Sequence, residues 1–266
     1  MILKLGDRSD YVKELQEALG IWVDGDFGPK TEKAVKQFQK ENELTVDGIV
    51  GPATWKALEE LQESTPYTLE QIRQAVETKG YKWFDGGDYD VNIVGVRSPD
   101  RDGEITNKYD DYITVSYKVN GEWNFHCWPA TTQPGMYWIK HPMNRKGCAI
   151  LVPDQYRGVY KIDGHGKTRY SALCQRLGKV RVYRDGNKDD VYDYDADSIT
   201  EGYYGINIHR SSAYKASNYI NKYSAGCQVF QDPDDFDEMM SIARKAKDAW
   251  GNKFTYTLLN SNDVTT

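Results

Sequence analysis

The sequence predicts an α+β protein, in which an N-terminal three-helix bundle is followed by a mainly β domain with a few helices. Helical apolar spacing and a repeated glycine turn occupy residues 1–63. Alternating apolar residues dominate from about residue 91 onward. Tyr11 is the only one of the 20 tyrosines before residue 66, so the composition changes between the two parts. We therefore expect domains at 1–63 and 67–266, with 64–66 as a linker, because Pro66 cannot continue a helix.

The composition excludes several classes of protein. The 266 residues hold 34 Lys and Arg against 40 Asp and Glu, a net charge of -6, and a nucleic-acid-binding protein is normally basic. No stretch approaches the roughly 18 apolar residues of a membrane span. The N-terminus, MILKLGDRSD, lacks the apolar core of a secretory signal, so we expect synthesis in the cytoplasm without a signal peptide.

The four cysteines do not form a metal-binding or disulfide-rich pattern. They are spread over 100 residues without a CxxC pair, so we expect no metal site and no cofactor. A lone cysteine is most often a small buried hydrophobic residue, and we expect this of Cys127, Cys148 and Cys174.

The first part contains an internal repeat. Residues 23–39 match residues 46–62 at nine of seventeen positions, with an offset of 23 residues. Each copy contains a glycine turn followed by Pro29 or Pro52, which suits the first turn of a helix. An earlier amphipathic segment carries Val12 and Leu15 on one face. The repeat therefore predicts three short helices around one small core.

The second part predicts mostly strands. Helical spacing predicts a helix over 68–79, ended by Gly80, and another around 236–243. Asn120-Gly121 predicts a two-residue hairpin turn. Alternation or a short apolar run predicts strands at 91–96, 113–119, 123–127, 180–183, 205–209 and 254–259.

The doubled D-G-x-x-G-P-x-T pattern resembles the type 1 peptidoglycan-binding domain over residues 3–62. The resemblance implies that this part binds bacterial peptidoglycan. Gly28 and Pro29 suit turn and packing positions. We expect Asp26, Phe27 and Ile49 to project from the loops and to contact the polymer.

Two segments carry the residue types of cysteine catalysis. One is 205–211, with His209, and the other is 223–229, with Cys227. A cysteine nucleophile reacts as a thiolate and needs a base within hydrogen-bond reach and donors for the developing oxyanion. Small residues precede Cys227, so a substrate carbonyl can approach the N–H groups of Gly226 and Cys227. We expect His209 to fold back onto Cys227 as its base.

This pattern resembles the L,D-transpeptidase catalytic domain, whose motif is a His, then roughly fourteen to seventeen residues, then [Ser/Thr]-His-Gly-Cys. Here 14 residues separate His209 from Ser224-Ala225-Gly226-Cys227. The resemblance implies that Cys227 is the nucleophile and His209 the general base, and that Ser224 and Gly226 shape the oxyanion site. Ala225 departs from the family pattern, which has a second His there.

Further residues are candidates for substrate binding. Arg210 follows the predicted base and is a candidate partner for a peptide carboxylate or for a structural Asp. Asn207 shares a strand face with His209 by alternation. His165 lies in a glycine-containing loop, and Tyr156 and Arg157 lie in a segment with turn residues, so we expect all three near the cleft.

These predictions together describe a monomeric endolysin of phage or prophage type that acts on the cell wall after its release. Cys227 would attack a stem-peptide carbonyl, and water would resolve the thioester, as in an L,D-carboxypeptidase or endopeptidase. Three alternatives stay open: an L,D-transpeptidase that forms cross-links, a muramidase-type lysin that uses two carboxylates, and a non-catalytic wall-binding virion protein. The sequence alone does not identify the bond cleaved or the third catalytic partner.

Overall fold

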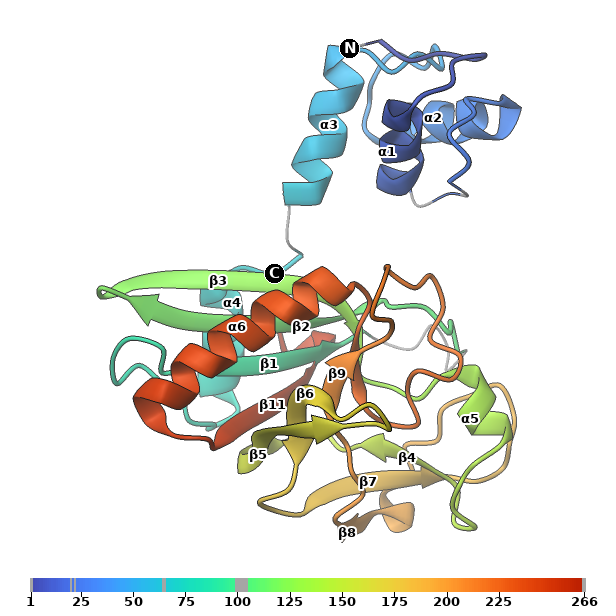
Figure 1. Cartoon of the computed structure of the whole chain (residues 1–266). Helices are drawn as coiled ribbons and strands as arrows, with labels where there is room; N and C mark the ends of the chain where they lie inside the picture. The colour runs from blue at the N-terminus through green and yellow to red at the C-terminus, as the bar shows by residue number, and fades with distance from the viewer. Residues whose placement is uncertain (1, 20, 22, 64–65, 99–104, 265–266) are drawn as a thin grey trace. The chain divides into compact units, whose positions relative to one another are not determined.

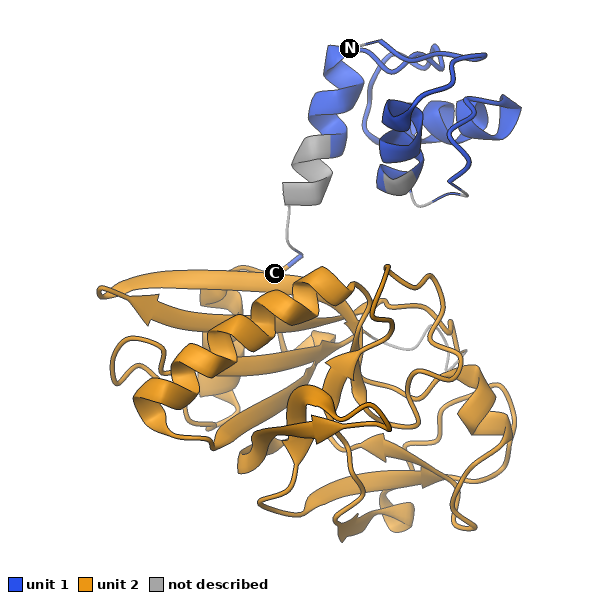
Figure 2. Ribbon diagram, viewed as in Figure 1, with its two compact units in different colours: residues 1–66 blue, residues 67–266 orange. Residues whose placement is uncertain are grey.

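The computed structural model describes residues 2–19, 21, 23–63, 66–98 and 105–264, in the mixed α+β class that the sequence predicts. The chain divides into two compact units, residues 1–66 and 67–266 (Figure 2). Most of the predicted linker, residues 64 and 65, lies outside the described residues. Among the described helices, none combines the length and the apolar character needed to cross a membrane.

The N-terminal unit contains three helices, α1 (Asp10–Ala18), α2 (Pro29–Glu41) and α3 (Pro52–Glu63). Pro29 and Pro52 begin α2 and α3, as predicted. Between the helices, a short antiparallel bridge joins Leu3 to Val50. One cluster of buried apolar side chains holds the unit together: Leu3, Val12, Leu15, Phe27, Val35, Val50 and Leu58.

Two buried glutamines explain why the turn sequence repeats. Gln16 is 1% exposed, and its side-chain amide forms hydrogen bonds with the backbone and side chains of the first turn. Gln39, 23 residues later, does the same in the second turn. The equivalent partners are Asp24 and Asp47, Gly25 and Gly48, Asp26 and Ile49, and Thr31 and Thr54. Each turn is therefore held by one side chain that satisfies its polar groups away from water.

The second unit is built on a closed barrel of eight strands in the order β1-β11-β5-β6-β9-β10-β3-β2, with a second sheet in the order β4-β7-β8 (Figure 1). The barrel strands are β1 (Asn92–Arg97), β2 (Asp111–Val119), β3 (Glu122–Thr131), β5 (Gln155–His165), β6 (Tyr170–Gln175), β9 (Ile208–Arg210), β10 (Gln228–Phe230) and β11 (Phe254–Asn260). The smaller sheet contains β4 (Cys148–Leu151), β7 (Val180–Asp185) and β8 (Thr200–Gly202).

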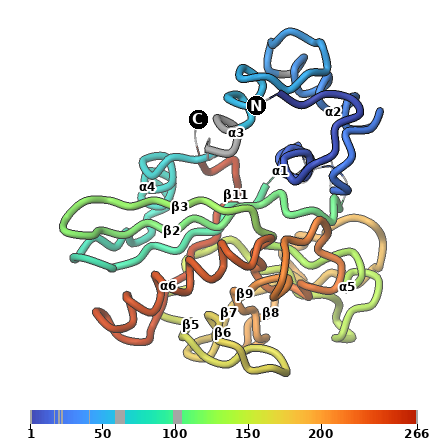
Figure 3. The backbone as a smooth tube through the Cα atoms, turned by 45° about the horizontal axis from the view of Figure 1, so that its top comes forward, coloured from blue at the N-terminus to red at the C-terminus, as the bar shows by residue number. Residues whose placement is uncertain are grey.

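Three α-helices accompany the sheets: α4 (Leu69–Thr78), α5 (Met136–Lys140) and α6 (Pro233–Trp250). Two 3-10 turns lie at Ala196–Ser198 and Ser261–Asp263. The long helix α6 runs beside the barrel strands (Figures 1 and 3). Its side chains Phe236, Met239 and Met240 share the largest core cluster with barrel residues such as Tyr160 and Tyr256. The barrel and α6 thus form one hydrophobic core that fixes β9 and β10.

Most predicted elements of this unit are confirmed. The helix at 68–79, the helix around 236–243 and the strands at 91–96, 180–183 and 254–259 are present within a few residues of the predicted bounds. Asn120 and Gly121 both have positive φ values, 52° and 83°, as a two-residue hairpin turn requires. Cys148 and Cys174 are buried, whereas Cys127 is only half-buried.

The strand predicted over 205–209 is wrong in its first half, because β9 begins only at Ile208. Gly205 has a φ of +70°, which is incompatible with a strand. The side-chain oxygen of Gln175 accepts hydrogen bonds from three successive N–H groups, those of Tyr204, Gly205 and Ile206. The Gln175 side chain therefore satisfies the backbone N–H groups that a neighbouring strand would otherwise bond along this segment.

Candidate active site

The parallel pair β9 and β10 brings the two predicted catalytic residues onto neighbouring segments of the chain. Gln228 is opposite Ile208, and Val229 is opposite His209. One residue earlier in the same register, Cys227 lies beside Asn207, and the Asn207 N–H donates a hydrogen bond to Cys227 Sγ at 3.5 Å. Because side chains alternate along a strand, Asn207 and His209 share a face.

Cys227 is half-buried, and its thiol has two backbone partners. Sγ accepts from Asn207 N–H and donates to the Gly205 carbonyl, both at 3.5 Å. Burial raises the pKa of this thiol to about 11. Within the described residues no hydrogen bond joins Sγ to the His209 ring, so the resting cysteine is a protonated thiol held by the loop before β9.

His209 is buried, and one backbone contact defines its tautomer. Its Nδ1 lies 2.9 Å from the Arg210 carbonyl oxygen. A carbonyl can only accept, so Nδ1 carries the proton and Nε2 is left as an acceptor. Burial, aided by the neighbouring His165 ring, lowers the pKa of His209 to about 3. The ring is therefore neutral near pH 7 and has a lone pair available on Nε2.

His165, at the end of β5, stacks on His209 with ring centroids 4.2 Å apart. The Asn207 side chain joins the group: its Oδ1 accepts from Gln175 N–H, so its Nδ2 donates to His165 Nδ1 at 2.9 Å. His165 consequently carries its proton on Nε2, the opposite tautomer to His209. The structure thus brings three predicted site residues, His165, Asn207 and His209, into one connected group.

Arg210 extends from the same strand toward α6. Its guanidinium lies 3.3 Å from the Asp237 carboxylate and 4.8 Å from the centre of the Tyr170 ring. The side chain therefore has a structural acidic partner, the second of the two roles considered for it.

Ser224 and Gly226 shape the turn before Cys227. Ser224 is fully buried, and its Oγ donates to the Cys227 carbonyl at 2.7 Å and accepts from Gly226 N–H at 3.2 Å. Gly226 has a φ of +119°, and a Cβ there would lie 2.2 Å from the Ala149 carbonyl oxygen, so only glycine fits. The Gly226 N–H is already bonded, contrary to the expectation that it is free for an oxyanion. In the described part of the chain, the Cys227 N–H donates no hydrogen bond.

Two predicted binding residues are buried instead of exposed. Tyr156 was expected near the cleft, but it lies on β5 at 5% exposure, and its hydroxyl donates to the Val152 carbonyl at 2.6 Å. The segment is a strand, and its alternation leaves Arg157 exposed on the other face. The projection of Phe27 from its loop is also wrong, because the side chain is fully buried in the core of the N-terminal unit. An apolar side chain at this position packs inward, as Val50 does in the second copy.

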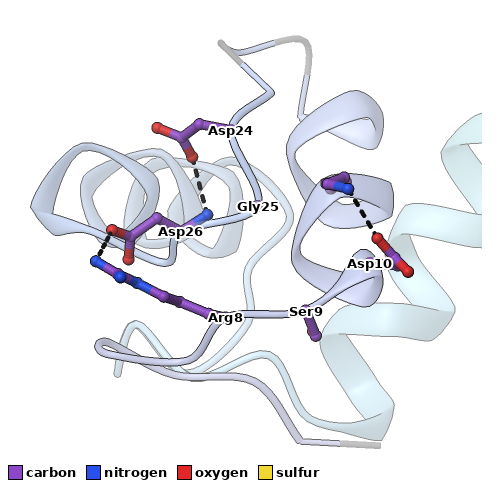
Figure 4. A pocket seen from close by; sticks show the side chains of 7 residues that line it. Arg8, Ser9, Asp10, Asp24, Gly25 and Asp26 are labelled. Carbon is purple, nitrogen blue, oxygen red and sulfur yellow. Dashed lines mark hydrogen bonds and ion pairs between the residues drawn. The ribbon is translucent and has the colours of Figure 1, made fainter.

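A shallow pocket lies on the first turn of the N-terminal unit (Figure 4). Arg8 Nη2 lies 2.7 Å from Asp26 Oδ2, and Asp24 accepts from the Asp26 N–H at 2.9 Å. Ile49, at the position equivalent to Asp26, is 39% exposed. Asp26 and Ile49 are thus accessible at corresponding places in the two turns.

Several contributors to the catalytic face were missed from the sequence. The Arg210 carbonyl and the Gln175 side chain position the imidazoles and the 204–206 segment, and neither has a sequence signature. Among the described residues, no group of three or more His, Cys, Asp or Glu side chains could hold a metal ion.

Residues 8–58 match the family model described as "Putative peptidoglycan binding domain". The chain therefore carries a peptidoglycan-binding domain at its N-terminus. This supports peptidoglycan as the partner of the protein and the cell wall as its place of action. The match covers the two repeated turns and leaves the second unit unassigned.

The solved structures that the chain matches include two proteins of related description. The Burkholderia AP3 phage endolysin matches at 33% identity over 29% of this chain and 32% of that chain, with a TM-score of 0.22, so the match spans about a third of that protein. A fused Zn-dependent amidase/peptidase/peptidoglycan-binding domain-containing protein from Clostridium acetobutylicum matches at 15% identity, over 97% of this chain and 99% of that chain, with a TM-score of 0.25. Both TM-scores are low, and no fold assignment rests on them. No curated protein matches the chain.

Proposed function

We propose that this protein is an endolysin-type peptidoglycan hydrolase whose second unit cleaves the stem peptide by cysteine chemistry of the L,D-transpeptidase kind. The proposal rests on the parallel pairing of β9 with β10, in which His209 is on β9 and Cys227 directly precedes β10, and on the unprotonated Nε2 of His209. The peptidoglycan-binding domain supports the wall as the site of action.

The first half of the reaction forms a thioester. The Cys227 thiol leaves the Gly205 carbonyl and turns toward His209, whose Nε2 takes the proton as sulfur attacks a stem-peptide carbonyl carbon. The tetrahedral oxyanion is held by the Cys227 N–H, which has no other partner in the described part of the chain. The carbon–nitrogen bond then breaks, and the leaving amine departs with the proton from His209.

The second half releases the acid. Water gives a proton to His209 Nε2 and attacks the thioester carbonyl, and the carbon–sulfur bond breaks as the thiol regains its proton. If an amine replaced water, the same thioester would give a new cross-link. We favour water because a linked wall-binding domain raises the effective concentration of the enzyme on the polymer, which suits a lysin.

The Cys227 thiol and the His209 imidazole both rest uncharged near pH 7, with pKa values of about 11 and about 3. In this proposal His209 acts as a general base during the attack. The Arg210 carbonyl is the third partner, since it orients the ring through Nδ1–H.

The remaining site residues have supporting roles in this proposal. Asn207 and His165 hold the face of the His209 ring, while Ser224 and Gly226 fix the backbone before the nucleophile. Arg210 steadies the carbonyl that orients the base. On the N-terminal domain, Asp26 and Ile49 are the proposed points of polymer contact.

Mass spectrometry of peptidoglycan fragments released by wild type and by Cys227→Ala tests this function. Cys227→Ser, which nearly keeps the size of the side chain and replaces the thiol by a hydroxyl, is the matched control for folding. We expect wild type to release products with new peptide termini and both variants to release none, although both should sediment with walls. New reducing sugar ends would indicate a muramidase, and binding without any product would indicate a non-catalytic wall protein. Either result, or undiminished digestion by Cys227→Ala, would refute the proposal.

A further inference from the structure

A cavity outside the candidate active site lies where two parallel strands end. Strands β1 and β11 pair in parallel, and the last residues of the two strands, Arg97 and Asn260, are opposite each other. The cavity that they help to line has a volume of about 310 Å³, at the lower end of the range for small-molecule sites. None of its lining residues belongs to the group around Cys227 and His209. The cavity is therefore a separate place in the second unit where a small ligand can bind.

Arg97 places a buried positive charge at this cavity. The residue is only 3% exposed, yet it is one of the lining residues. Its Nε donates to Thr132 Oγ1 at 3.0 Å, and its Nη2 donates to the Thr132 carbonyl at 2.9 Å. Within the described part of the chain Nη1 donates no hydrogen bond, although a guanidinium has five N–H donors. The unused donors leave Arg97 able to bind a further acceptor.

The carboxyl groups near the cavity do not occupy these donors. Asp111 is fully buried and accepts three hydrogen bonds from neutral groups, two of them from Thr132. Asp111 offsets part of the Arg97 charge, but no ion pair joins the two side chains among the described residues. Asp263 also lines the cavity, and its carboxylate pairs with Lys79 at 2.6 Å. Both carboxyl groups have other partners, so an incoming anion can take the free N–H groups of Arg97.

Two tyrosines and a polar turn form other parts of the cavity wall. Tyr183 and Tyr194 line it and contact each other edge to face, with ring centres 5.5 Å apart. The Arg97 guanidinium lies 5.7 Å from the centre of the Tyr194 ring. Ser261 and Asn262, in the turn after β11, line the cavity too, and their side chains form no hydrogen bond with any residue that the structure describes. The cavity thus combines a cation, aromatic rings and neutral hydrogen-bonding groups.

This combination fits a sugar acid, that is, a monosaccharide whose ring carries a carboxylate. A guanidinium suits a planar carboxylate, because its N–H donors form a fork of matching geometry. Aromatic rings pack against the C–H face of a sugar ring, and hydroxyl and amide side chains both donate to and accept from sugar hydroxyl groups. A small inorganic anion would use only the guanidinium, and a neutral sugar would leave the guanidinium without a partner.

We propose that the cavity binds a sugar acid, with its carboxylate on Arg97, its ring against Tyr194 and its hydroxyl groups on Ser261 and Asn262. A free monosaccharide and the end of a polysaccharide present the same chemistry to the cavity. The site does not depend on cysteine chemistry, because none of these residues contacts the reacting sulfur.

NMR titration of the full-length protein tests the proposal, because it measures weak binding and shows which residues the ligand contacts. The probe is D-glucuronate, compared with glucose, which lacks the carboxylate, and with acetate, which lacks the ring. The test variants are Arg97→Gln and Asn262→Ala. The matched control is Asn218→Ala, which removes an exposed asparagine outside the cavity. Thermal melting checks the folding of each variant.

We expect glucuronate to bind wild type about tenfold to hundredfold more tightly than glucose or acetate, as for a charge-assisted hydrogen bond supported by ring contacts. Asn262→Ala should weaken the binding of glucuronate by about threefold to tenfold, and Asn218→Ala should leave it unchanged. A folded Arg97→Gln should bind glucuronate no better than glucose.

The comparison of ligands keeps the proposal falsifiable even if Arg97→Gln fails to fold. Equal binding of glucuronate and glucose to wild type would overturn the role of the guanidinium, and equal binding of acetate would overturn the role of the ring. Unchanged binding of glucuronate to Asn262→Ala, or shift changes confined to residues outside the cavity, would refute the site itself.

A disaccharide that ends in glucuronate distinguishes the two sources of the ligand. Tighter binding than the monosaccharide would support the site and identify a polysaccharide end, whereas weaker binding would support the site and identify a free sugar acid. These titrations involve no turnover, so their failure would leave the catalytic proposal for Cys227 intact.

Discussion

A buried glutamine organises a backbone turn in each unit of the molecule, but over very different lengths of chain. Gln39, the last residue of the first copy of the repeat, forms hydrogen bonds with residues 8 to 15 positions away in the turn of the second copy. Gln175 accepts from the N–H groups of residues 204–206, about 30 positions away, and donates to the carbonyls of Gly178 and Gly202. The first turn is a local unit that can be repeated in sequence. The second is a tertiary contact that positions Gly205 against the proposed nucleophile.

Because of this difference, loss of a glutamine should have separate effects on binding and catalysis in one unit but not in the other. In the N-terminal unit, loss of a glutamine should harm only the domain that binds the wall. In the second unit, the same chemical change should harm both the fold and the candidate site, because the Gln175 side chain holds the 204–206 segment, whose Gly205 carbonyl accepts the Cys227 thiol.

The largest effect is expected from replacing these glutamines. Gln39→Ala and Gln175→Ala each remove five hydrogen bonds of a buried amide. Each should lower the free energy of unfolding of its own unit by about 3 to 5 kcal/mol. Urea unfolding monitored by tryptophan fluorescence, together with cleavage of a soluble stem peptide, measures both consequences.

The activity readout distinguishes the two regions. Gln39→Ala should lose wall sedimentation but should cleave the soluble peptide normally, whereas Gln175→Ala should lose cleavage. If Gln39→Ala also lost soluble-peptide cleavage, the separation of the two units proposed here would be wrong.

Two glycines provide a comparison inside the second unit. Gly226→Ala places a Cβ 2.2 Å from a backbone carbonyl, while Gly205→Ala meets nothing within 4 Å, although both have positive φ values. We expect Gly226→Ala to lower the free energy of unfolding by about 2 to 4 kcal/mol. Gly205→Ala should lower it by about 1 kcal/mol, because only backbone strain acts there. Equal losses in thermal unfolding would show that the approach of Gly226 to β4 is not a constraint.

The acid stability of the unit should depend on His209. Its pKa is about 3 when folded and near 6.5 when unfolded, so above pH 7 both states are neutral and the residue has no effect. Below pH 6.5 the unfolded state binds the proton and the folded state does not, so stability falls as pH falls. Between pH 6 and 4, the free energy of unfolding of wild type should fall by about 1.4 kcal/mol per pH unit relative to that of His209→Gln.

Buried carboxyl groups change the stability with pH in the opposite direction to His209. The pH profile must therefore be measured for both wild type and His209→Gln. Burial raises the pKa of Asp111 to about 6 and that of Asp235 to about 7, so these groups favour the folded state as pH falls. Because they are common to wild type and His209→Gln, the difference between the two pH profiles isolates the imidazole. Parallel profiles would contradict the buried, neutral state of His209.

The sequence predicts local features well and long-range ones poorly. The Asn120-Gly121 turn, the prolines that begin α2 and α3, and the stripe on α6 depend on neighbouring residues, and all are present. His209 and Cys227 lie on neighbouring segments because one excursion of the chain joins β9 to β10, and these two strands pair in parallel.

Other parts of the site depend on strand register, which the sequence does not specify. His165 reaches His209 through the β5–β6 hairpin and the pairing of Leu173 with Ile208. The errors at Phe27 and Tyr156 have a related cause, since turn-forming neighbours suggested exposure where an aromatic side chain packs inward.

The central claim is that a stem-peptide fragment becomes covalently attached to Cys227. Rapid acid quenching of the full-length enzyme with a soluble stem peptide, followed by intact-mass analysis and peptide mapping, tests it most directly. We predict a mass increase equal to the acyl fragment, located on the peptide that contains Cys227 and absent from Cys227→Ala and His209→Gln. Peptide cleavage by wild type with no adduct at any quench time, or an adduct on another residue, would contradict the account.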